Sequence, residues 1–200
     1  METIAGDIRI WSWFSTPHGY NFNGFLVPHP QGNICIDPVQ ASASDLEEVA
    51  GARPTRILLT NRNHVRAANV VRERTGARIG IHPDDAPHAR SQGAVVDDEF
   101  RGGEHVGPLA VIAVPGKSPG EVALHWPERK ILIVGDAVIG NPPGRCGLLR
   151  EQVMDEPARL RESVRELLAL DFETLLVGDG VPILSGAKER LRELVATFPR

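Results

Sequence analysis

The sequence predicts an α/β fold in which two β-sheets pack on each other and helices cover the outside. Two observations lead to this prediction. Short apolar runs typical of strands alternate with helix-like segments along the first half of the 200-residue chain. The second half repeats the layout, and no linker-like segment separates the two halves. Because a chain of this length fits one domain of ordinary size, we expect a single domain over residues 1–200.

The first half opens with Ile8–Trp11, where apolar and polar residues alternate as in a half-buried strand. Pro and Gly between two apolar runs indicate a hairpin turn at residues 28–32. Ser44 is suited to cap a helix, since Glu47 follows it three residues later. The remaining expected elements are a strand at 56–60, a helix over 67–74 that stops at Gly76, a strand at 78–81 and a turn at 82–85.

The second half supplies four strand-like runs and two helix-like segments. Leu160, Val164 and Leu167 recur at spacings of three and four, which predicts an amphipathic helix over Pro157–Leu170. We expect the strands at 109–114, 122–126, 131–134 and 174–177, and a closing helix at 187–197.

The composition excludes several classes of protein. A formal net charge of −4 gives no reason to expect nucleic acid or an anionic membrane surface as a partner. No apolar run approaches the roughly 20 residues that span a bilayer, and the first residues do not resemble a signal peptide. Cys35 and Cys146 form no Cys-x-x-Cys pattern, which favours thiols in a reducing compartment. We therefore expect a cytoplasmic protein of unknown oligomeric state.

Several short motifs follow one another in an order that resembles the metallo-β-lactamase superfamily, in particular its hydroxyacylglutathione-hydrolase-like members. They are Asn33–Pro38, Thr60–Arg66, Val114–Gly120, Gly135–Ala137 and Val177–Gly180. The resemblance covers nearly the whole chain and implies the four-layer αββα sandwich of that family. It also implies which positions would face a metal pocket.

The metal-binding motif itself is degenerate. The family's Thr-His-x-His-x-Asp-His run, which holds two metal ions, is replaced by Thr60–Arg66. Its ligand positions carry Asn61, Asn63, Val65 and Arg66. Lys117 and Asp179 stand where the family has two further His residues, and Asp136 alone keeps the family's residue.

These substitutions argue against a metal. Zinc prefers imidazole, thiolate or carboxylate ligands, and an arginine cannot donate a lone pair. Deprotonating Lys117 at pH 7 would cost about 4–5 kcal/mol before any bond formed. We therefore expect no metal and no other cofactor, although His64 or His82 could serve as an unusual ligand. We expect Lys117 and Arg66 to pair with Asp136 and Asp179 instead.

Three hypotheses remain open at this stage. The charged cluster could be a structural element that binds nothing. Alternatively, Asn61, Asn63, His64 and Arg66 could receive an anionic small molecule, with Lys117 beside them. Finally, Lys117, Asp136 and Asp179 could be catalytic, with Lys117 or His64 transferring a proton. No Gly-x-Ser-x-Gly motif suggests an activated nucleophile.

Our first choice is a metal-independent binding or non-catalytic homologue with a charged pocket. The alternative is a hydrolase of a thioester, ester or lactone that uses an unusual or metal-free site.

Overall fold

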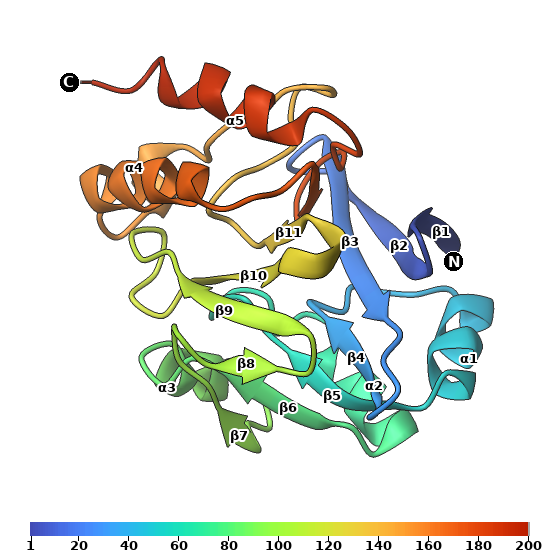
Figure 1. Ribbon diagram of the computed structural model, residues 1–200. Coiled ribbons are helices and arrows are strands. Elements are labelled where there is room, and N and C mark those ends of the chain that lie inside the picture. The colour runs from blue at the N-terminus through green and yellow to red at the C-terminus, as the bar shows by residue number, and fades with distance from the viewer. Residues whose placement is uncertain (200) are drawn as a thin grey trace. The chain divides into compact units, whose positions relative to one another are not determined.

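The computed structural model describes residues 1–199 and divides into two compact units that meet in the sequence at Phe100 and Arg101. Each unit contains one β-sheet and its own helices (Figure 1). The predicted mixed α/β fold with two sheets and accompanying helices is therefore confirmed. The single-domain assignment stays a prediction.

The sheet of the first unit has seven strands, which lie in sequence order from β1 to β7. Strands β1 to β4 pair antiparallel, and β4 to β7 pair parallel. The strands are β1 Glu2–Ala5, β2 Ile8–Ser15, β3 Tyr20–Val27, β4 Asn33–Ile36, β5 Pro54–Leu58, β6 Arg78–Ile81 and β7 Asp98–Glu99. Parallel strands end at the same edge of a sheet. This edge therefore carries Asp37 after β4, the loop after β5, and His82 after β6.

Three helices complete the first unit: α1 Ala43–Gly51, α2 Ala68–Thr75 and α3 Ala86–Ser91. Val49 of α1 and Val71 of α2 pack with Ile57 and Ile79 of the sheet in one apolar core. As predicted, α2 ends at Gly76, which has the left-handed φ of 76° that suits a helix end.

The predicted cap of the first helix was wrong. Ser42, not Ser44, caps α1, since the Ser42 Oγ accepts the Asp45 backbone N–H at 3.1 Å. The same hydroxyl donates to the Asp45 carboxylate at 2.8 Å. Ser42 therefore makes the reciprocal contacts expected of a capping residue and the acid three positions later.

The sheet of the second unit has five strands in the order β12-β11-β10-β9-β8. Only β11 and β12 pair parallel. The strands are β8 His105–Val106, β9 Leu109–Ala113, β10 Val122–Trp126, β11 Ile131–Val134 and β12 Thr174–Val177. Asp136 and Asp179 thus follow the ends of two neighbouring parallel strands.

Helices α4 Pro157–Glu166 and α5 Ala187–Val195 lie side by side along the second unit (Figure 1). Leu160 of α4 and Leu191 of α5 pack with Leu132 and Leu175 of the sheet. The helix predicted to reach Leu170 instead tightens into a 3₁₀ turn, η3 Leu167–Ala169; two further 3₁₀ turns are η1 Pro127–Arg129 and η2 Glu151–Val153. Among the described residues, no helix is both long and apolar enough to cross a bilayer.

The turn after β9 is held closely against the start of α4. The Gly116 carbonyl accepts the Glu156 N–H at 2.8 Å. Gly116 has a φ of +135°, and a Cβ added there would lie 2.2 Å from the Leu160 backbone nitrogen. Only glycine fits this position, which directly precedes Lys117.

Replacing Gly116 with alanine should therefore destabilise the protein by about 2–4 kcal/mol, because both the backbone conformation and the contact with α4 oppose a side chain. The free energy of unfolding in urea measures this effect. Gly144→Ala is the matched control: its φ is +78°, but an added Cβ meets no described atom within 4 Å. Equal losses in the two variants would contradict the role of the α4 contact.

Candidate functional site

Asp37 anchors the loop that follows β5. Its Oδ1 accepts the Thr60 N–H at 2.8 Å, and its Oδ2 accepts the Thr60 hydroxyl at 2.6 Å. Both side chains are buried. Asp37 has a φ of 45°, an uncommon conformation for a residue other than glycine. The carboxylate is therefore held in a specific orientation, with donors that offset the cost of burying its charge.

His64 extends this network from Asp37 to Arg66. Its Nδ1 lies 2.8 Å from Asp37 Oδ2, and its Nε2 lies 3.0 Å from Arg66 Nη2. A carboxylate only accepts hydrogen bonds, and a guanidinium only donates them. These partners assign the ring proton between His64 and Asp37 to Nδ1, and the acceptor role toward Arg66 to Nε2.

Arg66 is positioned from two sides. One Nη2 bond goes to His64, and the guanidinium carbon lies 4.0 Å from the centre of the Phe22 ring. This is the geometry of a cation–π contact. Arg66 also has a positive φ of 30°, and such strained residues cluster at functional sites. The loop thus carries a permanently charged guanidinium whose position is fixed by His64 and Phe22.

The other residues of the loop divide between core and surface. Val65, at the family's Asp position, packs into the apolar core of the first unit. Asn63 is exposed, whereas Asn61 is fully buried. The Asn61 Oδ1 accepts the Asn63 N–H at 2.8 Å. Its Nδ2 has no hydrogen-bond partner within residues 1–199.

The second unit contains a buried ion pair. Lys117 Nζ lies 3.3 Å from Asp136 Oδ2, and each side chain is only 6% exposed. Carboxylate oxygens of Asp136 and Asp179 lie within 4.8 Å of each other. The Gly178 N–H donates to the Val134 C=O, and this bond aligns the ends of β11 and β12 that precede the two acids. The predicted pairing of Lys117 with Asp136 is therefore confirmed.

The structure assigns the predicted residues to separate units: Asn61, Asn63, His64 and Arg66 to the first, and Lys117, Asp136 and Asp179 to the second. From the sequence alone, Asp37 and Thr60 are identified only as members of motifs and, like Phe22, are not assigned to the site. The sequence feature that could have identified Asp37 is an acidic residue directly after a buried strand. Phe22 gave none, because alternating aromatic residues are ordinary in strands.

Groups at this edge of the first sheet make contacts within the first unit. Ala67 N–H and Ala68 N–H, at the start of α2, donate to Pro38 C=O and Val65 C=O. The Nδ1 of His82 accepts the Asp84 N–H at 3.2 Å in a local turn. The suggestion that His82 could serve as an unusual metal ligand stays a prediction.

Neither cysteine has the character of a nucleophile. Burial raises the pKa of the Cys146 thiol to about 12. Burial also raises the pKa of Cys35, and the nearby Asp37 charge raises it further. Since the thiolate is the reactive form, both groups are inert at neutral pH.

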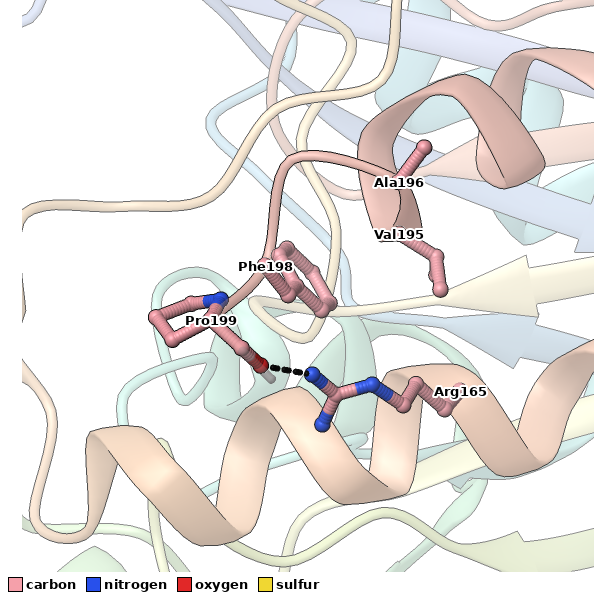
Figure 2. A pocket seen from close by; sticks show the side chains of 5 residues that line it. All are labelled: Arg165, Val195, Ala196, Phe198 and Pro199. Atoms are coloured by element: carbon pink, nitrogen blue, oxygen red, sulfur yellow. Dashed lines mark hydrogen bonds between the residues drawn. The ribbon is translucent and has the colours of Figure 1, made fainter.

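A separate hollow in the second unit lies between α4 and the C-terminal segment (Figure 2). Arg165 Nη2 donates to Pro199 C=O at 2.6 Å, and its guanidinium faces the Phe198 ring at 5.4 Å. The remaining lining residues are Val195 and Ala196. Arg165 is the single ionisable group among these lining residues and is bonded within the chain, so we assign the hollow no chemistry.

The Lys117–Asp136 pair leads to a prediction about stability. Lys117→Met should cost about 3–5 kcal/mol in free energy of unfolding, because it leaves the buried Asp136 charge without its cation. The double variant Lys117→Met with Asp136→Asn should recover part of the loss. Urea denaturation at pH 7 measures both values.

Lys130→Met is the matched control for this experiment. Lys130 pairs with Asp171 at 2.9 Å, but the two side chains are 58% and 73% exposed. Removing such a surface pair should cost about 0–1 kcal/mol. A loss at Lys117 no larger than the loss at Lys130 would refute the stabilising role of the buried pair.

Comparison with known proteins identifies the family of this chain. A sequence profile of the metallo-beta-lactamase superfamily matches residues 2–198. The hydroxyacylglutathione hydrolase of Acidiphilium cryptum is 31% identical over 173 residues, which cover 82% of this chain and 66% of that protein. The hydroxyacylglutathione hydrolase of Fuscovulum blasticum is 30% identical over 164 residues, covering 78% of this chain and 60% of that protein. The chain thus spans less than two thirds of the length of these relatives.

Solved structures show the same fold. The metallo-beta-lactamase from Pontibacter korlensis has a TM-score of 0.79 at 16% identity and covers 98% of both chains. TTHA1623 in a di-iron-bound form has a TM-score of 0.72 at 26% identity and covers 90% of this chain and 98% of its own. The predicted metallo-β-lactamase-like fold is confirmed, and the chain belongs to the metallo-beta-lactamase superfamily.

Proposed function

We propose that this chain is a metal-independent member of the superfamily that binds a small anion. The observation that carries the proposal is the placement of Arg66. Its guanidinium is held between the His64 imidazole at 3.0 Å and the Phe22 ring at 4.0 Å. A guanidinium offers a planar set of donors that matches carboxylate and phosphate oxygens.

The residues of the first unit do not fit the family's dinuclear metal centre. Asn61, Asn63, Val65 and Arg66 stand at its ligand positions. His64 is a ligand by type, but the lone pair of its Nε2 accepts from Arg66 and its Nδ1 carries a proton. An imidazole must present a lone pair to bind a metal, so His64 would have to release Arg66 first.

The second unit also disfavours a dication. Lys117 places an ammonium 3.3 Å from Asp136 Oδ2, which is the one family ligand that the sequence retains. An ammonium at this position repels a metal ion and uses the carboxylate that would bind it.

A second candidate function is supported by a specific set of side chains. His64 of the first unit, and Asp136 and Asp179 of the second, are buried and of metal-ligand type. The named relatives are hydroxyacylglutathione hydrolases. The alternative is thus a hydrolase of a thioester, ester or lactone that uses an unusual site, in which Lys117, Asp136 and Asp179 would be the catalytic candidates.

The proposal includes a cytoplasmic location and a small-molecule partner. Both cysteines are unpaired thiols, as expected in a reducing compartment, which supports a cytoplasmic location. The mild net charge of −4 supports a small-molecule partner over nucleic acid or a membrane surface.

Elemental analysis separates the two candidate functions. Protein purified without a metal-affinity tag should contain less than about 0.1 zinc or iron per chain, because the available ligands are engaged by Arg66 and Lys117. Thioester and lactone substrates should show no metal-stimulated turnover. A stoichiometric metal, or hydrolysis that appears on adding zinc or iron, would support the hydrolase and overturn the first proposal.

Anion binding is tested by the shift of melting temperature with sulfate and with acetate, against sodium chloride at equal ionic strength. At a hundredfold excess over Kd, the melting temperature of the wild type should rise by about 5–11 °C. Arg66→Ala should lose this gain, because the cation is removed.

Arg129→Ala is the matched control for that measurement. The Arg129 guanidinium also stacks on an aromatic ring, at 4.1 Å from Trp126, but in the second unit. This variant should keep the anion-induced gain. No gain in the wild type, or an equal gain in Arg66→Ala, would refute the anion site.

A further inference from the structure

We propose that Asn61 determines the specificity of this site, by donating a hydrogen bond from Nδ2 to an oxygen of the bound anion. The inference rests on the proposed function and adds a second, uncharged contact to the one that Arg66 supplies. The ligand it selects is a carboxylate or another oxyanion, as opposed to a halide.

The Asn61 amide is a buried donor that the chain itself does not satisfy. The residue has an exposed fraction of 0%. Its Oδ1 accepts the Asn63 N–H at 2.8 Å, and within residues 1–199 its Nδ2 has no acceptor. Buried polar groups are nearly always paired, because leaving one unpaired costs free energy. Such a donor indicates an acceptor that comes from outside the chain.

The orientation of the amide is determined by its other end. A backbone N–H can only donate, so the atom facing Asn63 must be the oxygen. The amide therefore cannot be flipped, and the unsatisfied atom is the nitrogen. A ligand at this position must bring an acceptor.

Asn61 and the Arg66 cation are connected through His64. The Asn61 backbone carbonyl accepts the His64 N–H at 3.2 Å, and the His64 Nε2 accepts from Arg66 at 3.0 Å. Both residues are thus hydrogen-bonded to His64, Asn61 through the two backbones and Arg66 through the imidazole ring. A neutral donor on one residue bonded to His64 and a positive charge on the other suit an oxyanion, whose several oxygens can use both.

The residue at position 61 differs from the family's histidine in the kind of ligand atom that it can bind. By the resemblance, the family has a histidine there, which offers a lone pair to a metal cation. The amide nitrogen of Asn61 offers N–H groups, and its lone pair is delocalised into the carbonyl. The same position therefore changes from recognising a cation to recognising an electron-rich oxygen.

The test compares sulfate and acetate binding by the wild type, Asn61→Leu and Asn61→Asp, using calorimetry and melting temperature. Asn61→Leu removes the donor, together with the acceptor for the Asn63 N–H, at similar volume. Asn61→Asp keeps the shape and the acceptor for Asn63 N–H, but replaces the donor with a negative charge. Asn21→Ala, which removes an exposed amide on β3, is the control.

We expect Kd to rise at least tenfold in Asn61→Leu, as for loss of one hydrogen bond to a charged acceptor, and binding to vanish in Asn61→Asp. Asn21→Ala should bind as the wild type does. Without anion, Asn61→Leu should melt only about 1–6 °C lower than the wild type, because it loses the single Oδ1 bond to the Asn63 N–H while the Nδ2 donor it removes is unsatisfied.

Each other outcome overturns a distinct claim. If Arg66→Ala loses anion binding but both Asn61 variants keep it within threefold, the Asn61 inference is wrong and the anion site stands. If Asn61→Leu without anion loses more stability than the Asn63 bond accounts for, while Asn61→Asp also melts well below the wild type, Nδ2 has a structural partner and the inference is wrong. If the wild type binds neither anion, the proposed function fails, and the inference fails with it.

Discussion

The carboxylate of Asp37 is the group on which the arrangement of the first unit depends. It lies 1% exposed and receives hydrogen bonds from the Thr60 backbone, the Thr60 hydroxyl and the His64 ring. A charge buried to this degree is tolerated only when donors surround it. Those donors come from the loop after β5, so satisfying Asp37 also shapes the loop. The protonation of His64 and the position of Arg66 follow from that requirement.

Buried acidic residues of both units lie close to positively charged or hydrogen-bonding side chains. In the first unit, the negative charge of Asp37 is linked through the His64 imidazole to the Arg66 cation. In the second unit, Lys117 lies against Asp136, near the Asp179 carboxylate. Side-chain cations thus offset buried negative charge in both units, as the proposed metal-independent role requires.

The fold and the Lys117–Asp136 pair could be predicted from the sequence, since ordered motifs indicate the family and opposite charges at its ligand positions indicate pairing. The link from Asp37 through His64 to Arg66 could not. His64 occupies a position without a ligand role in the family motif, and its contacts depend on positive φ angles at Asp37 and Arg66. The choice of Ser42 over Ser44 as a cap was also undecided, because each serine has an acid three residues later.

The protonation state of His64 makes this residue observable. A ring proton on Nδ1 that is shared with a buried carboxylate exchanges slowly with water and resonates far downfield of the amide protons. Its Nε2, which accepts from a guanidinium, has the nitrogen chemical shift of an unprotonated imidazole. One side chain therefore provides a spectroscopic reporter of the whole loop, readable in solution without a ligand, a substrate or an assay.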